Sequence, residues 1–353
     1  MRRRAALLGI AALLLGCGTS LGTTSASGSW APMAQSPLSA RYGSVGAWTG
    51  SELVVVGGST SQPCPVGAVC DMAVPDGLRD GAAYDPARDR WRRIADSPLP
   101  VFDAPTAWSG SEVVVLTPRA TLTYDPAEDV WDTWSRRPYS DVSQIVPTDR
   151  GLLVVGYSTR GRDPVDWVFA DHEWSPLPRD PFGESYDRSI AWDGERHWLL
   201  SMAVENHFEA TRGASSRVAV LEDGVWSVVS ESTTKLGYEQ RWWFTGRRMV
   251  VPPRNAGEAA YYEPDAARWT SLDTSEDHDC NLPVLGVGPE WVGGGGSVLV
   301  GAASPQFLDV PACPQLARPD TAVWAGRELL VWGGVSPDSR NQSVGLRWTP
   351  PAP

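Results

Sequence analysis

Seven polar residues stand at recurring places along this sequence and could together form a ligand site. Their side chains could bind a polar ligand, or serve as acid, base and orienting groups toward a small carbohydrate. In chain order they are Arg41, Asp103, Asp187, Arg188, Arg241, His278 and Asp320. The same charges could instead pair with one another and have only a structural role.

Each of these residues stands near the start of a repeated unit. One phrase of the unit places Tyr-Asp-Pro or Tyr-Glu-Pro seven residues before a tryptophan, as at Tyr84, Tyr124 and Tyr262. A second phrase is an aromatic residue, any residue and a glycine, followed by a short apolar run. It begins at Trp48, Trp108, Trp192, Phe244 and Trp324. Self-similarity of this kind sets the architecture of the chain.

The first unit predicts four short strands. The entering strand is Tyr42–Trp48, and the glycine of Thr49-Gly50-Ser51 allows the tight turn after it. The β-branched run from Leu53 to Gly58 is typical of a strand buried on both faces. The third strand ends at the turn Tyr84-Asp85-Pro86, and Trp91 opens a fourth strand that continues to Pro100.

The same sequence pattern recurs seven times between Ser29 and Pro353, at roughly 46 residues per unit, which is close to the period of propeller blades. The predicted units are 41–100, 101–139, 140–182, 183–234, 235–277 and 278–319, with the seventh split between the chain ends. The sixth lacks the Tyr-Asp-Pro phrase. The segment from Ser29 to Leu38 reads as the missing fourth strand of the last unit and would close the ring.

The combination of these phrases with double glycines at Gly57-Gly58 and Gly333-Gly334 resembles the kelch-type β-propeller family, whose blades are also those of galactose oxidase. The resemblance implies an all-β propeller of seven blades, with six as the alternative. Most of the 18 tryptophans would then pack between neighbouring blades.

The N-terminus resembles a bacterial lipoprotein signal. Arg2–Arg4 precede an apolar stretch that ends in Leu14-Leu15-Gly16-Cys17. The resemblance implies a signal peptide over 1–16 and a flexible tether over 17–28 that starts at lipidated Cys17. The propeller over 29–353 would then sit on the outer side of the bacterial membrane. Ordinary secretion is the alternative.

The other four cysteines favour disulfides in an exported chain. Pairing each with its near neighbour joins Cys64 to Cys70 and Cys280 to Cys313, although four cysteines allow three connectivities. The paired spacing of a zinc site is absent. We therefore expect no metal and no cofactor.

Composition and motifs exclude several function classes. The formal charge of −12 disfavours binding to nucleic acid. A copper site like that of galactose oxidase would need tyrosine and histidine ligands, and the four histidines form no evident ligand pair. Sialidase boxes do not fit the spacing around Ser189. Sugar mutarotases and epimerases built on kelch blades would use a similar polar channel mouth, and no residue pattern selects or excludes them.

Long loops on a rigid scaffold are the usual place for binding, and the insertions 59–79, 203–216 and 335–342 are expected on one face. The leading hypothesis is a monomeric binding protein that engages a protein or an envelope glycan through this face. The alternative is an extracellular carbohydrate-active enzyme that uses the channel-mouth residues.

Overall fold

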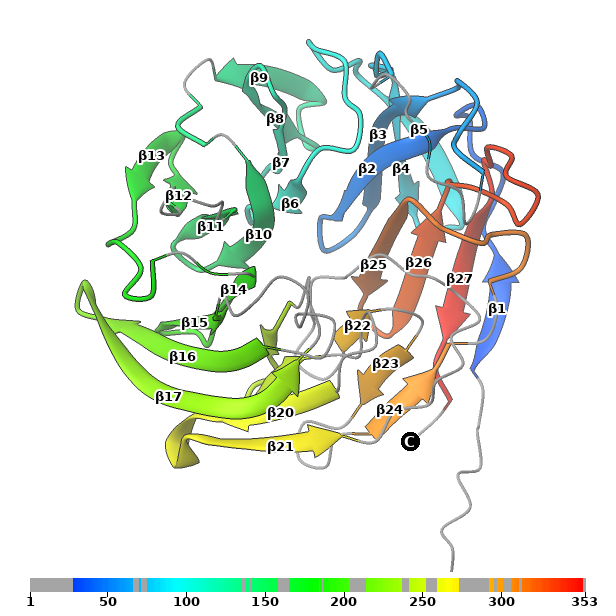
Figure 1. Ribbon diagram of the computed structural model, residues 1–353. Helices are drawn as coiled ribbons and strands as arrows, with labels where there is room; N and C mark the ends of the chain where they lie inside the picture. Colours follow the sequence, from blue (N-terminus) through cyan, green and yellow to red (C-terminus); the bar gives the residue numbers. More distant parts are fainter. Residues whose placement is uncertain are drawn as a thin grey trace, which may run out of the picture.

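The computed structural model shows an all-β molecule whose antiparallel sheets follow one another around a ring (Figure 1). Six sheets have four strands, and one further sheet has three described strands. The structure describes residues 28–65, 70, 75–134, 137–139, 141–157, 165–183, 185, 187–203, 214–236, 241–251, 259–272, 292–294, 297–300, 306–310 and 313–351. The fold is therefore a β-propeller with six complete four-stranded blades.

In every blade but the last, the strands run in sequence order from the centre of the ring to its edge; in the last blade the outermost strand is β1. The first two blades are β2 (Tyr42–Trp48), β3 (Leu53–Ser59), β4 (Gly81–Asp85) and β5 (Arg90–Ile94), then β6 (Thr106–Trp108), β7 (Val113–Leu116), β8 (Thr121–Asp125) and β9 (Val130–Trp134). The third and fourth are β10 (Val142–Thr148), β11 (Gly151–Gly156), β12 (Trp167–Ala170) and β13 (Glu173–Pro176), then β14 (Asp187–Trp192), β15 (His197–Met202), β16 (Ala214–Glu222) and β17 (Val225–Leu236).

The remaining sheets complete the ring. The fifth blade is β18 (Trp243–Phe244), β19 (Met249–Val251), β20 (Ala259–Glu263) and β21 (Arg268–Leu272), with the short 3-10 helix η2 (Pro264–Ala266) between its last two strands. The three-stranded sheet is β22 (Val292–Gly294), β23 (Ser297–Val300) and β24 (Gln306–Asp309). The last blade is β25 (Thr321–Ala325), β26 (Glu328–Trp332), β27 (Gly345–Thr349) and β1 (Ser29–Pro32).

The first blade shows how the repeated phrases build the strands. Gly50 lies in the turn between β2 and β3 with φ of +94°, a conformation that glycine adopts at little cost. Every residue of β3 is buried, as its continuous apolar sequence predicts. The fourth strand ends at Ile94, so the prediction that it continues to Pro100 is wrong beyond that point. The chain instead turns there toward the second blade.

The N-terminal strand closes the ring, as the sequence predicts. β1 pairs antiparallel with β27, and Trp30 lies opposite Trp348 (Figure 1). In the first blade, Asp89 Oδ1 accepts from Ala34 N at 2.8 Å, and Trp91 Nε1 donates to Ala34 O at 2.9 Å.

The second blade repeats both contacts one blade further along the chain. Asp129 accepts from Ala95 N, and Trp131 donates to Ala95 O, each at 2.9 Å. The chain after β1 therefore has the same role toward the first blade as the chain after β5 has toward the second.

The innermost strands line the centre of the ring. β2 contacts both β25 and β6, and the series continues through β10, β14 and β18. Aromatic side chains pack between adjacent blades, as where Trp91 of the first blade meets Trp332 of the last at 6.1 Å between ring centroids. Among the described residues, no helix is long and apolar enough to cross a membrane. Residues 1–27, including Cys17, lie outside this part of the chain.

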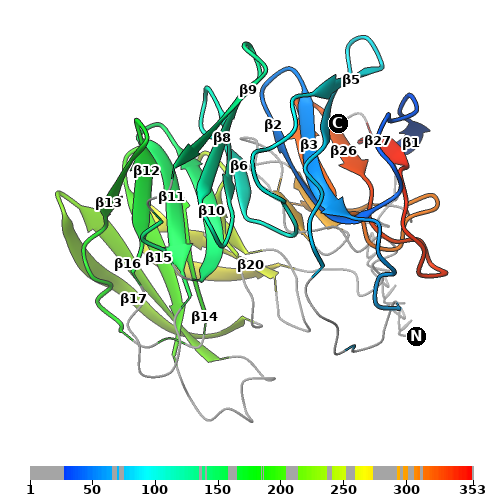
Figure 2. The same ribbon diagram turned by 90° about the horizontal axis from the view of Figure 1, so that it is seen from above.

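The antiparallel order sends each loop to one of two faces, which are seen edge-on in Figure 2. The connections between second and third strands, together with the connections between blades, leave from one end of the sheets. We call this end the loop face. The predicted insertions 59–79, 203–216 and 335–342 join second to third strands and so belong to it.

Candidate functional site

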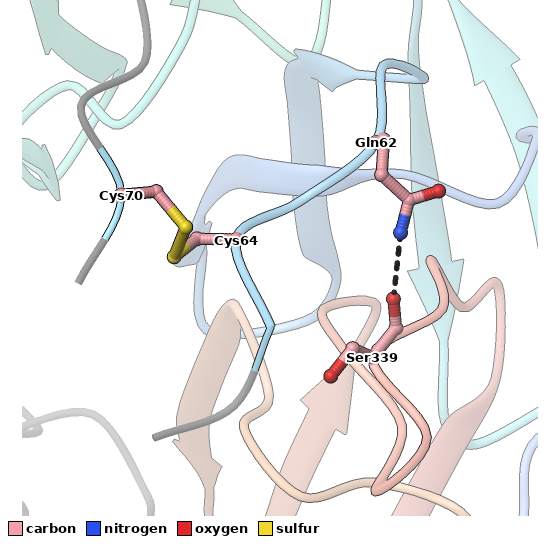
Figure 3. Close-up of a disulfide and its surroundings, with 4 residues drawn as sticks. All are labelled: Gln62, Cys64, Cys70 and Ser339. Atoms are coloured by element: carbon pink, nitrogen blue, oxygen red, sulfur yellow. Dashed lines mark hydrogen bonds between the residues drawn. A yellow bond between two sulfur atoms is a disulfide. The ribbon is translucent and has the colours of Figure 1, made fainter. Parts of the chain in front are cut away.

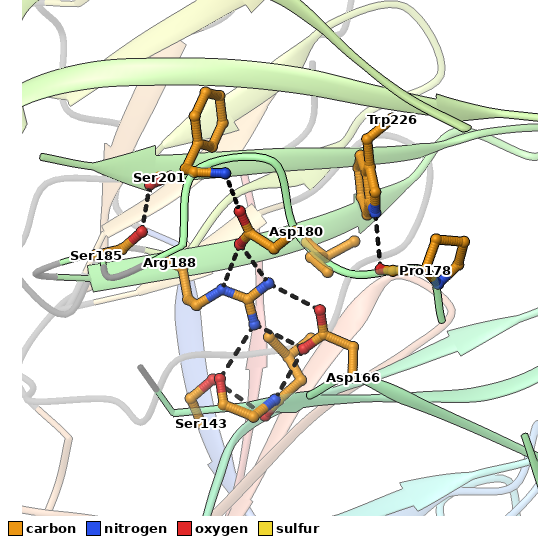
Figure 4. Close-up of polar contacts among 12 residues, drawn as sticks. Ser143, Asp166, Pro178, Asp180, Ser185, Arg188, Ser201 and Trp226 are labelled. Atoms are coloured by element: carbon orange, nitrogen blue, oxygen red, sulfur yellow. Dashed lines mark hydrogen bonds and ion pairs between the residues drawn. The ribbon is translucent and has the colours of Figure 1, made fainter. Parts of the chain in front are cut away.

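Arg188 of β14 is the centre of a buried cluster of charges at the loop face (Figure 4). Its guanidinium donates to both Asp166 oxygens, at 2.6 and 2.8 Å, and to Asp180 Oδ2 at 2.9 Å. The side chains of Arg188, Asp166 and Asp180 are 1%, 2% and 1% exposed. Burial acts against the charged form of Arg188, but the two carboxylates raise its pKa above the ordinary value.

The cluster also joins the third blade to the fourth. Arg188 Nη1 donates to Gly156 O at the end of β11, and Asp166 Oδ1 accepts from Gly156 N. Asp166 precedes β12, whereas Asp180 lies in the connection between the blades. Because every N–H group of the Arg188 guanidinium donates to a protein acceptor, this side chain links the two blades and has no donor left for a ligand.

Asp187 and Arg241 extend this charged region toward the fifth blade. Arg241 Nη1 lies 3.4 Å from Asp187 Oδ1, and both side chains are 10% exposed. Arg241 Nη2 also donates to Ser143 O at 2.8 Å. Since Arg241 precedes β18 and Ser143 lies in β10, the side chain spans from the fifth blade to the third, across the entry of the fourth.

Arg41 forms a similar cluster within the first blade. It donates to Gly57 O at 2.9 Å and to both oxygens of Asp80, at 2.7 and 3.0 Å. Arg41 is 1% exposed, but the Asp80 side chain is 30% exposed. The hydrogen bond from Arg41 is the largest cause that holds the pKa of Asp80 below its usual value.

Asp320 lies where the last blade meets the first. Its Oδ2 accepts from the backbone nitrogen and the hydroxyl of Ser44, at 3.1 and 3.0 Å. Burial raises the pKa of Asp320 to about 6, although hydrogen bonds from Gly43 and Ser44 and the charge of Arg318 act in the opposite direction. Asp103 lies nearby, because its backbone nitrogen donates to Gly43 O at 2.8 Å, but its side chain is exposed.

The seven predicted residues therefore fall into two groups. Asp187, Arg188 and Arg241 come together between the third and fifth blades. Arg41, Asp103 and Asp320 gather where the first and last blades meet, whereas His278 lies outside the described residues. Among the described residues of this set, Asp187 and Arg241 pair with each other, whereas Arg41 and Arg188 pair with carboxylates outside the set.

Three carboxylates of these clusters were not singled out from the sequence, namely Asp80, Asp166 and Asp180. Asp80 and Asp166 share a detectable signal, because each stands just before the third strand of its blade and beside a glycine in the last three residues of the second strand, Gly57 or Gly156. Their role becomes evident only when these blade positions are aligned. Asp180 has no such counterpart in the first blade.

Two of the predicted insertion loops meet on the loop face (Figure 3). Gln62 Nε2 donates to Ser339 O at 3.2 Å, and Asn341 Nδ2 donates to Ser61 O at 2.9 Å. Beside these contacts, Cys64 and Cys70 form the predicted disulfide. These contacts join residues that are 277 and 280 positions apart in the chain.

The second predicted disulfide and the loop 203–216 lie partly outside the described residues. Cys313 is also disulfide-bonded, and its predicted partner Cys280 lies outside the described residues. Most of the loop 203–216 lies outside them as well.

The histidines within the described ranges are held by aromatic neighbours. His172 stacks on Trp134 with 4.3 Å between ring centroids and pairs with Glu112 at 2.7 Å. His197 is buried beside Trp192, and this burial lowers its pKa to about 4. Within the described part of the chain, no three His, Cys, Asp or Glu side chains are grouped to hold a metal ion.

The whole sequence was also compared with known proteins. It matches no protein-family model, and no curated protein matches it. The assignment to a β-propeller thus stands on the sheets and their closure, and any narrower family assignment stands on the repeated phrases alone.

Proposed function

We propose that this chain is a kelch-type propeller that binds a protein partner or an envelope glycan through its loop face. It would be held on the outer side of the bacterial membrane by lipidated Cys17. The observation that carries the proposal is the meeting of the loops at Gln62–Ser339 and Asn341–Ser61 beside the Cys64–Cys70 bridge. Together they form one surface from distant parts of the chain.

Two physical arguments support binding at this surface. A disulfide and inter-loop hydrogen bonds restrict the loops before contact, which reduces the entropy lost on binding. The charges of Arg41, Arg188 and Arg241 are already used within the protein, so the loops offer more available contacts than those three side chains do. A rigid scaffold carrying such loops is a common arrangement in binding proteins.

The test uses the full chain on isolated envelope material, with purified wall glycan and envelope protein as separate fractions. Asn341→Ala and the pair Cys64→Ser with Cys70→Ser should each weaken binding several-fold, because they loosen the joined loops. Glu128→Ala, at an exposed turn on the opposite face, is the matched control and should bind like the wild type. Equal binding by all variants, or no binding to either fraction, would refute the proposal.

The anchor is tested separately by intact mass of the membrane-fraction protein. We expect a mass that corresponds to a chain beginning at diacylated Cys17, and loss of membrane association in Cys17→Ala. An unlipidated mass would remove the anchor from the proposal.

Asp320 is the observation that favours a second candidate function, catalysis on a small carbohydrate. A carboxyl whose pKa is about 6 can exchange a proton near neutral pH, as a general acid or base must. If a sugar mutarotation or epimerisation were found, Asp320→Asn should reduce its rate at least a hundredfold. Retention of the rate in that variant would exclude this role for Asp320.

A further inference from the structure

Arg217 is a second arginine at the loop-face end of the fourth blade, and its surroundings differ from those of Arg188. It lies near the start of β16, opposite Ser201 of β15. Its Nη2 donates to Ser201 Oγ at 2.9 Å and lies 3.4 Å from Ser185 Oγ. Its guanidinium carbon lies 4.6 Å from the centre of the Phe182 ring.

No carboxylate of the described residues forms an ion pair with Arg217. Across the described ranges, its polar contacts are the two serine hydroxyls, and its Nε is buried without a partner. Its Nη1 donates to no described group. Burial lowers the pKa of Arg217, and the more distant charges of Asp180 and Glu231 offset only part of this effect.

The nearest acidic side chain of the neighbouring cluster is already in use. Asp180 accepts from Arg188 through Oδ2 and from Phe182 N through Oδ1 (Figure 4). Glu231 lies opposite Arg217 in the register of β16 and β17 but forms no ion pair with it. A partly buried cation with unfilled donors has a cost in solvation that a bound anion would offset.

The chemistry of the surroundings selects the type of anion. A planar guanidinium fits a carboxylate. The hydroxyls of Ser185 and Ser201 are hydrogen-bonded to each other at 2.6 Å and accept from Arg217, so they orient the guanidinium. At this site the described residues offer one cation, Arg217, for the anion; the charge of Asp180 acts on Arg217, and the whole chain carries a formal charge of −12. These negative charges disfavour a phosphate dianion more than a singly charged carboxylate.

We propose that Arg217 binds the carboxylate of an acidic sugar at the loop face of the fourth blade, with the buried, mutually hydrogen-bonded hydroxyls of Ser201 and Ser185 positioning its guanidinium. Phe182 holds the guanidinium from one side through its ring, so the cation is positioned before the ligand arrives. The inference rests on the proposed function, since it names an acidic sugar as the glycan element that the loop face recognises.

The test is titration of the full chain with glucuronate, glucose and inorganic phosphate, followed by calorimetry or ligand-observed NMR. We expect glucuronate to bind at least tenfold more tightly than glucose, with affinity that falls as salt is added. Arg217→Met should lower glucuronate affinity at least tenfold, and Arg217→Lys should lower it less because the charge remains. Equal affinities for glucuronate and glucose, or tighter binding of phosphate, would overturn the proposal.

Arg196→Met is the matched control. Arg196 lies in the same blade and also stacks on an aromatic ring, that of Trp198, but it is paired with Asp193 and Glu222 at the opposite face. Its substitution should leave glucuronate affinity within twofold. If Arg217→Met fails to fold, Arg217→Lys and Ser201→Ala provide the same comparison.

The result separates this inference from the broader function. If glucuronate binds through Arg217 but envelope glycan and protein do not, the site stands and the proposed function fails. If an envelope fraction binds through the joined loops while glucuronate does not bind, the proposed function stands and the inference is wrong.

Discussion

Arg188 and Arg217 lie in the same blade and are linked through the segment of Asp180 and Phe182, yet they differ in how their charge is satisfied. Arg188 contacts two buried carboxylates, which keep its pKa high despite burial. Arg217 contacts two hydroxyls and a ring, and burial lowers its pKa. The comparison separates a cation that holds the fold together from a cation that remains available to a ligand.

Arg41 is a second arginine whose charge is satisfied within the protein, and it stands at a different position in its blade from Arg188. The acceptors are equivalent in both clusters, namely the carbonyl of a glycine in the last three residues of the second strand and an aspartate that precedes the third. Arg41 reaches these acceptors within its own blade, whereas Arg188 reaches those of the preceding blade. A repeated acceptor pair thus binds an arginine from whichever neighbouring segment supplies one.

Arg188→Met is expected to have the largest effect on this comparison. It leaves Asp166 and Asp180 buried without their cation, which should reduce the free energy of unfolding by about 3–5 kcal/mol. Arg217→Met leaves no carboxylate unpaired and should change it by less than about 1 kcal/mol. Urea unfolding of the two variants measures both values, and similar losses would contradict the distinction between the two arginines.

Asp320 extends the comparison to an acid, because it is buried with hydrogen bonds but without an ion pair at the described residues. Its folded pKa of about 6 lies above the ordinary 3.8 of an aspartate, so folding favours the protonated form. Its contribution to stability is therefore full below pH 4 and is lost as the pH rises through 6. At about 1.4 kcal/mol per pKa unit, the loss is up to about 3 kcal/mol.

His197 acts in the opposite direction over the same pH range. Its folded pKa of about 4 lies below the ordinary 6.5, so its contribution is full above pH 6.5 and is lost as the pH falls toward 4. The wild-type curve alone can therefore look flat. The measurement is the difference in unfolding free energy between wild type and Asp320→Asn from pH 4 to 7, which should shift in favour of the variant as the pH rises. A constant difference would show that the pKa of Asp320 is not raised.

The fold could be predicted from the sequence because local chemistry fixes each turn. Glycines of the aromatic-x-Gly phrase adopt positive φ, as at Gly50 and Gly110, and these turns fall where the phrase predicts them. The predicted units contain the observed blades, except that β17 continues two residues beyond the boundary at 234. The sheet β22–β24 lies in the predicted sixth unit, which lacks the Tyr-Asp-Pro phrase.

For the candidate site, the sequence could predict the face of the molecule on which it lies, but not the contacts between its side chains. Strand direction places Arg41 and Arg188 at one end of their sheets, but it does not say which carboxylate each will meet. The partners Asp80 and Asp166 lie 39 and 22 residues away in sequence, and the choice of blade depends on side-chain packing. Arg217 carried no sequence signal, because its distinguishing feature is a missing partner.

The turns Tyr124-Asp-Pro and Tyr262-Glu-Pro allow the comparison with the smallest expected effect, between a tyrosine hydroxyl that has a hydrogen-bond partner and one that has none among the described residues. Tyr124 donates to Asp129 Oδ1 at 2.7 Å, whereas the Tyr262 hydroxyl is buried without a partner in the described chain. The fifth blade has Ala267 at the position of Asp129, and both residues have positive φ, +47° and +56°. Ala267→Asp should therefore raise the free energy of unfolding by about 1 kcal/mol.

The gain in Ala267→Asp has two separable sources, because aspartate tolerates a left-handed backbone better than alanine and can also accept from Tyr262. Tyr262→Phe removes the second source alone. If the hydrogen bond forms, the gain from Ala267→Asp measured by urea unfolding should be smaller in the Tyr262→Phe background, and the difference is the coupling energy of the pair. The same gain in both backgrounds would assign the whole effect to the backbone. The unpaired hydroxyl at Tyr262 would then not be what limits the stability of this turn, and the parallel with Tyr124 and Asp129 would not hold.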